Sequence, residues 1–353
     1  MTDISLTAGF APTNFAGSRE HVRAATGVAP ATRFALLRQY GTAPQSYSAP
    51  FQPGLEHFGD ERGFLAYKKI GSTALVLSDP IAPRENISDL ISRFLKEHPD
   101  AGFWYLSRPI AELLDKRGFF VNAMGPDTRI DLATYNFSGG KKENLRRAIN
   151  RMKAGGFVTR ESTIAEVGYD KVKAVSDAWR QTRPVSGHEV AFLNRPLVLA
   201  DEPDVRRFFT FDRNGKLVAF GFFDPVCEGG EVVGYMTQHS RHLPEADVMV
   251  HFAIKRCAIE TFQKEGRKVL YLGLSPFAYI ENEQFGSRTH RTTRWYFQFA
   301  FKSWLFNRFF YACKGLEAHK RIFRGVPEQT YYAFNRLPSL PRVLKLARAC
   351  KII

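Results

Sequence analysis

The sequence predicts an α+β fold, because strand patterns and helical spacings alternate and the order strand–strand–helix–strand occurs twice. In the first half, residues 63–71 and 73–80 form two predicted strands separated by a turn. Apolar residues at helical spacing predict a helix over residues 87–99, and residues 102–107 form a third predicted strand.

The same order of elements returns in the second half. An Asn-Gly dipeptide predicts a turn before a strand over residues 215–226, and residues 231–239 form its antiparallel partner. Residues 247–266 predict a helix, and residues 267–276 predict the strand that follows it. Two interpretations stay open: two unrelated α+β units, or an internal duplication of one domain.

The composition is that of a folded chain with a polyanionic partner. The 353 residues are 44% hydrophobic and 24% charged, which excludes collagen, low-complexity sequence and extended disorder. Lys and Arg number 50 against 35 Asp and Glu, so the formal net charge is +15. Nucleic acid, an anionic membrane surface and a phosphorylated substrate are the partners that this charge favours.

The cysteines and the apolar segments predict a cytoplasmic protein. The four cysteines are far apart and have no metal-ligand spacing, so we expect neither a disulfide framework nor a zinc module. The first residues lack the pattern of a signal peptide. No run of about 18 uncharged apolar residues occurs, so no segment is expected to span a bilayer.

A basic helix is predicted between the two halves, within residues 137–157. Leu145, Ile149 and Met152 recur at helical spacing and form its apolar stripe. Basic residues surround the stripe: Lys141, Lys142, Arg146, Arg147, Arg151 and Lys153. The helix is either an ordinary solvated helix or a surface that binds tRNA or phosphate at the junction between the halves.

Four stretches, in order, carry a resemblance to a known family: residues 64–83, 138–157, 271–282 and 309–335. Together they resemble the C-terminal domain of the lysyl/alanyl-phosphatidylglycerol synthases. The third stretch corresponds to a strand that ends in LG-small-P, and the fourth to a KGL-x-x-x-K segment followed by a tyrosine-containing strand. The resemblance covers about residues 50–336.

The resemblance implies tandem GNAT-like acyltransferase domains, each a mixed sheet flanked by helices, packed around a tunnel. Residues 1–50 would form a loosely packed lead-in, residues 51–155 the first domain and residues 156–336 the second. Residues 337–353 would form a basic amphipathic tail.

The activity implied is transfer of an aminoacyl group from aminoacyl-tRNA to a hydroxyl of an anionic membrane lipid such as phosphatidylglycerol. The donor is already an activated ester, so neither a covalent enzyme intermediate, a cofactor nor a metal is expected. The family is usually fused to membrane-spanning segments, and this chain is predicted to be a stand-alone form, peripheral on the inner face of the cell membrane. The alternatives are a GNAT-type acyltransferase that uses an acyl thioester, and a non-catalytic binder of anionic lipid or RNA.

The resemblance also implies catalytic residues. Lys314 and Lys320 match the two lysines of the KGL segment, and Lys320 would face the tunnel and hold a phosphate or the transition-state oxygen. The alternative for Lys320 is a surface lysine. Arg241 matches the arginine of a D-x-x-R motif, but the acidic position reads Gln238 or His239 here.

A second acid of the family has no counterpart in residues 291–304. Such acids would pair with the ammonium group of the donor, so their loss weakens the aminoacyl assignment. His239 would be a general base or a structural histidine. Ser275, at a strand end, would donate to a bound carbonyl or start a turn.

Two C-terminal segments are candidates for contact with lipid. Residues 295–311 are rich in aromatic side chains, and Trp295, Phe299 and Trp304 would line a groove for acyl chains or pack in the core. The tail predicts a helix that anchors on a membrane surface or docks on the domain. Its basic residues recur at three-residue spacing: Arg342, Lys345, Arg348 and Lys351.

Overall fold

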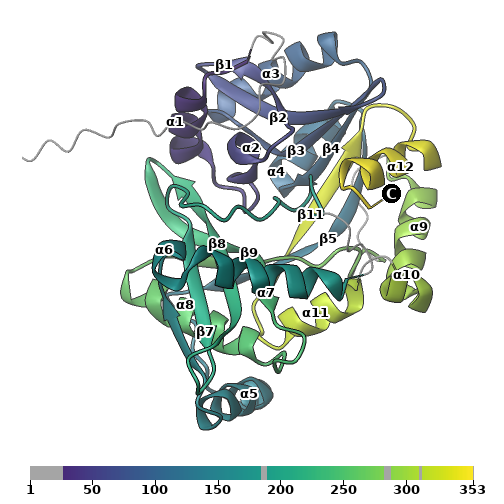
Figure 1. Cartoon of the computed structure of the whole chain (residues 1–353). Helices are drawn as coiled ribbons and strands as arrows, with labels where there is room; N and C mark the ends of the chain where they lie inside the picture. The colour runs from purple at the N-terminus through teal and green to yellow at the C-terminus, as the bar shows by residue number, and fades with distance from the viewer. Residues whose placement is uncertain (1–26, 184–188, 282–287, 310–311, 353) are drawn as a thin grey trace, which may run out of the picture.

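The computed structural model describes residues 27–183, 189–281, 288–309 and 312–352 (Figure 1). The strands are β1 (Glu56–Asp60), β2 (Gly63–Ile70), β3 (Thr73–Ile81), β4 (Ala101–Leu106), β5 (Phe120–Asp131), β6 (Val158–Glu161), β7 (Arg206–Phe211), β8 (Leu217–Glu228), β9 (Glu231–His242), β10 (Val269–Leu274) and β11 (Val326–Phe334). The helices are α1 (Pro30–Tyr40), α2 (Ser48–Phe51), α3 (Arg84–Glu97), α4 (Arg108–Lys116), α5 (Glu143–Ala154), α6 (Ile164–Val167), α7 (Tyr169–Gln181), α8 (Val250–Lys264), α9 (Arg291–Lys302), α10 (Trp304–Phe309), α11 (Cys313–Arg321) and α12 (Leu340–Ala349).

Within these residues, the strands form one mixed sheet in the order β1-β2-β3-β4-β11-β5-β10-β9-β8-β7-β6. The predicted repeat is present as β2-β3-α3-β4 and as β8-β9-α8-β10. In each half the first two strands are antiparallel and the strand after the helix is parallel to its neighbour. The predicted α+β class, with a mixed sheet flanked by helices in each half, is therefore confirmed.

The two halves are joined through β5 and β11. β5 pairs antiparallel with β10 on one side and with β11 on the other, and β11 also pairs with β4. The last strand of the chain thus lies inside the sheet of the first half. The proposed division at residues 155 and 156 stays a prediction, and the sheet continues across it without a break.

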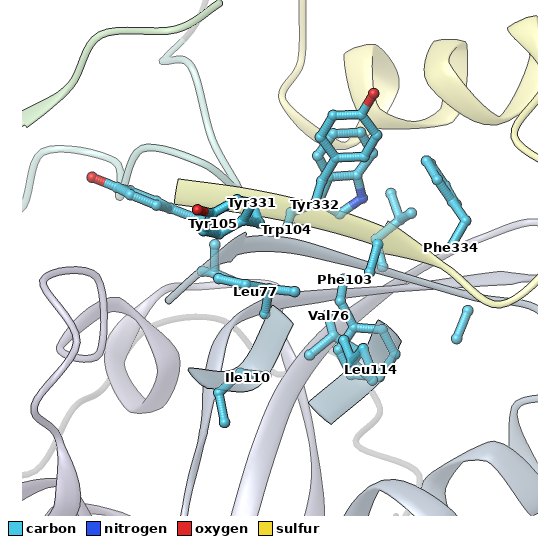
Figure 2. Packing of buried hydrophobic residues seen from close by; sticks show 14 of the residues in the cluster. Val76, Leu77, Phe103, Trp104, Tyr105, Ile110, Leu114, Tyr331, Tyr332 and Phe334 are labelled. Carbon is cyan, nitrogen blue, oxygen red and sulfur yellow. The ribbon is translucent and has the colours of Figure 1, made fainter. Parts of the chain in front are cut away.

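Aromatic stacking fixes β11 in its place between β4 and β5. The Trp104 ring of β4 stacks on the Tyr332 ring of β11 with centroids 4.9 Å apart, and Phe334 meets Trp104 edge-on at 5.4 Å. Figure 2 shows Trp104 and Tyr332 on one face of the sheet, with Phe103 toward the other. Each such pair contributes about 0.5–1.5 kcal/mol beyond the burial of its area.

The predicted loose packing of the lead-in is wrong for its described part. Leu37 of α1 and Tyr47 are buried, and the Tyr47 hydroxyl donates to the carbonyl of Pro203 at 2.8 Å. These residues form a small core with Phe64 and Ile81 of the first sheet strands. Large apolar residues of residues 27–50 thus pack against the sheet, a pattern that composition alone does not show. Residues 1–26 lie outside the described part.

Candidate functional site

The neighbouring strands β9 and β10 diverge after a short parallel pairing. Their pairing covers Gly234–Met236 with Val269–Tyr271 only. β9 continues to His242 along β8, whereas β10 passes through an irregular stretch after Tyr271 and follows β5. The facing edges of the two strand ends therefore lack a common ladder, and side chains of α8 and α11 reach this divergence.

Lys320 of α11 is bound at the end of β10. Its side chain is buried, and its Nζ donates to the carbonyl of Gly273 at 2.7 Å and to the carbonyl of Leu274. Gly273 has φ +85°, a conformation that glycine adopts without strain. The alternative that Lys320 is a surface lysine is wrong, and its catalytic role stays a prediction.

A buried carboxylate, Asp127 of β5, accompanies Lys320. The Tyr105 hydroxyl of β4 donates to Asp127 Oδ2 at 2.6 Å. Burial raises the pKa of Asp127 to about 6, and the charge of Lys320 and the Tyr105 hydrogen bond oppose that shift. Burial lowers the pKa of Lys320 to about 8, with Asp127 acting in the opposite direction. Asp127 of the first half thus acts electrostatically on Lys320 of the second half.

A second buried lysine, Lys255 of α8, lies next to Lys320. Its Nζ donates to Ser240 Oγ of β9 at 3.5 Å, the limit of a hydrogen bond. Burial, and then the charge of Lys320, lower the pKa of Lys255 to about 7. Sequence reasoning missed Lys255, although a lysine among the apolar residues of one helix face is a visible signal.

Two histidines, His251 and His319, adjoin Lys255, and a third, His242, contacts His251. The His251 and His242 rings are in contact, with Nε2 of His251 2.9 Å from Nδ1 of His242, and the His319 ring stacks on Phe252 with centroids 4.7 Å apart. Burial and then the charge of Lys255 hold the pKa of His251 and of His319 well below the usual range. Burial and then Arg183 lower the pKa of His242.

Arg241 and His239 point to the other face of β9, because successive residues of a strand alternate. Arg241 donates to both carboxylate oxygens of Glu189, at 2.8 and 2.6 Å, and to Ser176 Oγ of α7 at 2.7 Å. The carboxylate that pairs with Arg241 therefore comes from Glu189 and not from the positions of Gln238 and His239. Sequence reasoning missed it because the two partners are 52 residues apart.

The structure divides the predicted catalytic residues into two groups. Burial, and then the charges of Arg241 and Arg195, hold the pKa of His239 well below its usual range, so this ring is neutral. Ser275 is buried and directly follows the carbonyls that bind Lys320, and its amide donates to the carbonyl of Pro126 at 2.8 Å. Lys320 is bound at the end of β10, which Ser275 follows, whereas Arg241 and His239 lie on the other face of β9 and Arg241 binds Ser176 of α7.

The basic helix α5 has the predicted apolar stripe, with Leu145, Ile149 and Met152 buried in the second half's core. Two of its candidate phosphate ligands are engaged within the chain. Arg146 donates to the carbonyls of Phe137 and Gly139, and the Lys142 ammonium lies 3.8 Å from the centroid of the Tyr135 ring and donates to the carbonyl of Asn136.

The remaining candidates for phosphate binding lie at the surface. The side chains of Arg147 and Arg151 are 74% and 69% exposed, and their carboxylate neighbours are Glu143 at 2.6 Å and Asp247 at 3.5 Å. Lys141 is exposed. Lys314 is also exposed, and its Nζ donates to the carbonyl of Lys302 at 3.0 Å. Binding of tRNA by these residues stays a prediction.

The helices α9 and α10 expose aromatic side chains. Trp295, Phe299 and Trp304 are 58%, 61% and 65% exposed, so the expectation that they pack in the core is wrong. Phe297 and Thr293 occupy the buried side of α9 instead. No helix among the described residues has the length and apolar character to cross a bilayer.

The C-terminal helix α12 docks on the first half. Leu346 and Ala349 are buried there, Arg342 pairs with Asp100 at 3.0 Å, and Lys345 donates to Thr73 Oγ1 at 2.6 Å. Arg342 and Lys345 of the tail thus bind protein groups. Anchoring of the tail on a membrane stays a prediction.

The tunnel between the two halves, which the family resemblance implies, also stays a prediction. A hollow of about 470 Å³ lies on the second half, lined by residues such as Arg160, Lys171 and Arg213. It is open to solvent and does not contain the buried lysines.

The α+β fold is similar to that of the solved structure of L-PGS from Bacillus licheniformis. That structure is 19% identical, with a TM-score of 0.73, and the alignment covers 92% of this chain and 99% of that one. The chain belongs to the family described as phosphatidylglycerol lysyltransferase, C-terminal, which matches residues 34–334. The predicted family is therefore confirmed.

Two relatives named phosphatidylglycerol lysyltransferase show how much of such a protein this chain represents. The one from Bacillus subtilis (strain 168) is 24% identical over 292 residues, which are 80% of this chain and 32% of that protein. One from Staphylococcus epidermidis (strain ATCC 12228 / FDA PCI 1200) is 22% identical over 250 residues, 67% of this chain and 29% of that protein. The chain thus spans about a third of the length of these relatives.

Proposed function

We propose that this protein is an acyltransferase that moves an aminoacyl group from aminoacyl-tRNA to a hydroxyl of a membrane lipid such as phosphatidylglycerol. The family match over residues 34–334 carries the proposal. The names of the relatives supply the lipid and the class of reaction. The buried Lys320 at the end of β10, at the matching position of the KGL segment, supports it.

The chemistry requires positioning and electrostatic stabilisation rather than a covalent intermediate. The acceptor hydroxyl attacks the ester carbonyl carbon of the donor, and negative charge develops on the carbonyl oxygen. An ammonium has three N–H donors, and two of those on Lys320 bind the carbonyls of Gly273 and Leu274. The third is the group that we assign to the developing oxyanion or to a substrate phosphate.

The surfaces of the protein fit the two anionic substrates. Arg147 and Arg151 of α5 offer exposed positive charge to the tRNA backbone. Trp295, Phe299 and Trp304 offer exposed aromatic area to the lipid, the composition typical of a membrane–water interface. We therefore place the protein in the cytoplasm, peripheral on the inner face of the cell membrane.

The proposal is tested with the purified chain, tRNA charged with a radiolabelled amino acid, and vesicles that contain phosphatidylglycerol. We expect labelled lipid that disappears when ribonuclease is added first. The variant K320M should lose at least 100-fold in rate, whereas K264M, which removes an exposed lysine from α8, should retain it. If lipid is labelled from an acyl thioester, that thioester and not aminoacyl-tRNA is the donor. If no charged tRNA yields labelled lipid, the proposal is refuted.

A further inference from the structure

Lys255 is a buried cation that core packing does not require. It is 3% exposed and lies on the face of α8 that buries Ile254, Ala258 and Ile259 in the core of the second half. An apolar side chain of similar length would fill the same space without the cost of removing an ammonium from water. A buried lysine at such a position points to a use for its amine.

The surroundings of the amine do not neutralise it. Among the described residues, no carboxylate lies within ion-pair distance of Lys255, and its hydrogen bond to Ser240 is long. The groups that act on it or beside it are basic or uncharged: Lys320 and His319 of α11, His251 of α8, and behind His251 the ring of His242 and the guanidinium of Arg183. The nearby carboxylate, Asp127, accepts from Tyr105 and acts on Lys320.

The two lysines differ in how they are held. Lys320 is fixed by two carbonyls of the β10 end and balanced by Asp127, which suits a group that stays cationic. Lys255 has one weak contact, to a residue of β9 beyond the last β9–β10 pair. Its amine therefore lies where the two strands diverge. Burial and the charge of Lys320 lower its pKa to about 7, so a large fraction of it is neutral near neutral pH.

We propose that Lys255 is the proton-transfer residue of the reaction, accepting the proton of the lipid hydroxyl as that oxygen attacks the donor ester. The new C–O bond forms to the acyl carbon, and the C–O bond to the ribose oxygen of the donor then breaks. The proton on Lys255 Nζ passes to that departing oxygen, which restores the neutral amine. This inference rests on the proposed function and adds to it the residue that moves the proton.

The test compares K255M and K255R with the wild type and with K264M. The control variant K264M replaces an exposed lysine at the end of the same helix. Transfer from charged tRNA to lipid is measured from pH 5.5 to 8.5. We expect both Lys255 variants to lose at least 100-fold in kcat, because arginine keeps the charge but does not release its proton. K264M should retain the wild-type rate, and circular dichroism should confirm that each variant is folded.

The pH profile of the wild type gives a measurement that needs no variant. Its rate should fall on the acid side with an apparent pKa near 7, as Lys255 becomes protonated. Retention of activity by K255R would show a purely electrostatic role and overturn the proposal, as would a wild-type rate that is flat from pH 5.5 to 8.5. A wild-type protein without transfer at any pH would instead refute the proposed function itself.

Discussion

Replacing Lys255 with methionine should stabilise the protein, and the gain should depend on pH. In the unfolded chain the lysine has its ordinary pKa of 10.5, whereas burial lowers the folded-state pKa to about 7. This difference in pKa means that the protonated Lys255 lowers the free energy of unfolding by about 5 kcal/mol. Between these values the unfolded state binds more protons, so the free energy of unfolding of the wild type rises with pH. The full penalty is present below about pH 7 and disappears above pH 10.5.

The assay is urea unfolding of wild type and K255M at pH 6, 7 and 9. The stability advantage of K255M should be largest at pH 6 and should shrink by about 2.3 kcal/mol between pH 7 and pH 9, because half of the folded-state lysine is still protonated at pH 7. K264M should show no such dependence, because that lysine is exposed in the folded protein. An advantage that stays constant with pH, or a K255M protein less stable than wild type at pH 6, would refute the reasoning.

Three further changes test other parts of the structure. R195M should lose about 3–5 kcal/mol in urea unfolding, because it leaves Asp224, paired with Arg195 at 2.6 Å, as an unpaired buried charge. Adding D224N should restore part of that loss, and a single variant as stable as wild type would contradict the expectation. G125A should lower the Tm, because Gly125 has φ +129° and a Cβ there would lie 2.3 Å from the carbonyl oxygen of Ser275. An unchanged Tm would exclude this strain. The double change W295S/W304S should reduce sedimentation with anionic vesicles several-fold at an unchanged Tm, since both rings are exposed, and equal binding would remove these residues from the membrane contact.

The repeated element order was predictable because periodicity and turns are local properties of the sequence. β5 was not predictable in this way: it contains Gly125, Pro126 and Asp127, residues that are depleted in strands, and its partners β10 and β11 are far away along the chain. β11 was anticipated only through the family resemblance. Tertiary pairing stabilises both strands, and no window of the sequence contains that information.

The site was predictable where a sequence motif reports a contact. Lys320 was found through the KGL segment, and the structure places it at a strand end. Asp127 and Glu189 were missed because their partners come from distant segments. Arg146 was assigned to phosphate from its charge, yet the backbone of its own loop accepts its hydrogen bonds. Charge along a helix shows which side chains are basic but not which of them the protein itself uses.

The position of β11 has a consequence for synthesis on the ribosome. β4 and β5 are close in the sequence, yet they are separated in the sheet by a strand that begins at Val326. The amino-terminal half therefore cannot close its hydrogen-bond ladder until Val326–Phe334 has emerged, and closing so long a loop slows folding. Translation products that stop before Val326 should present two open strand edges and an unstacked Trp104, which makes them substrates for chaperones and proteases.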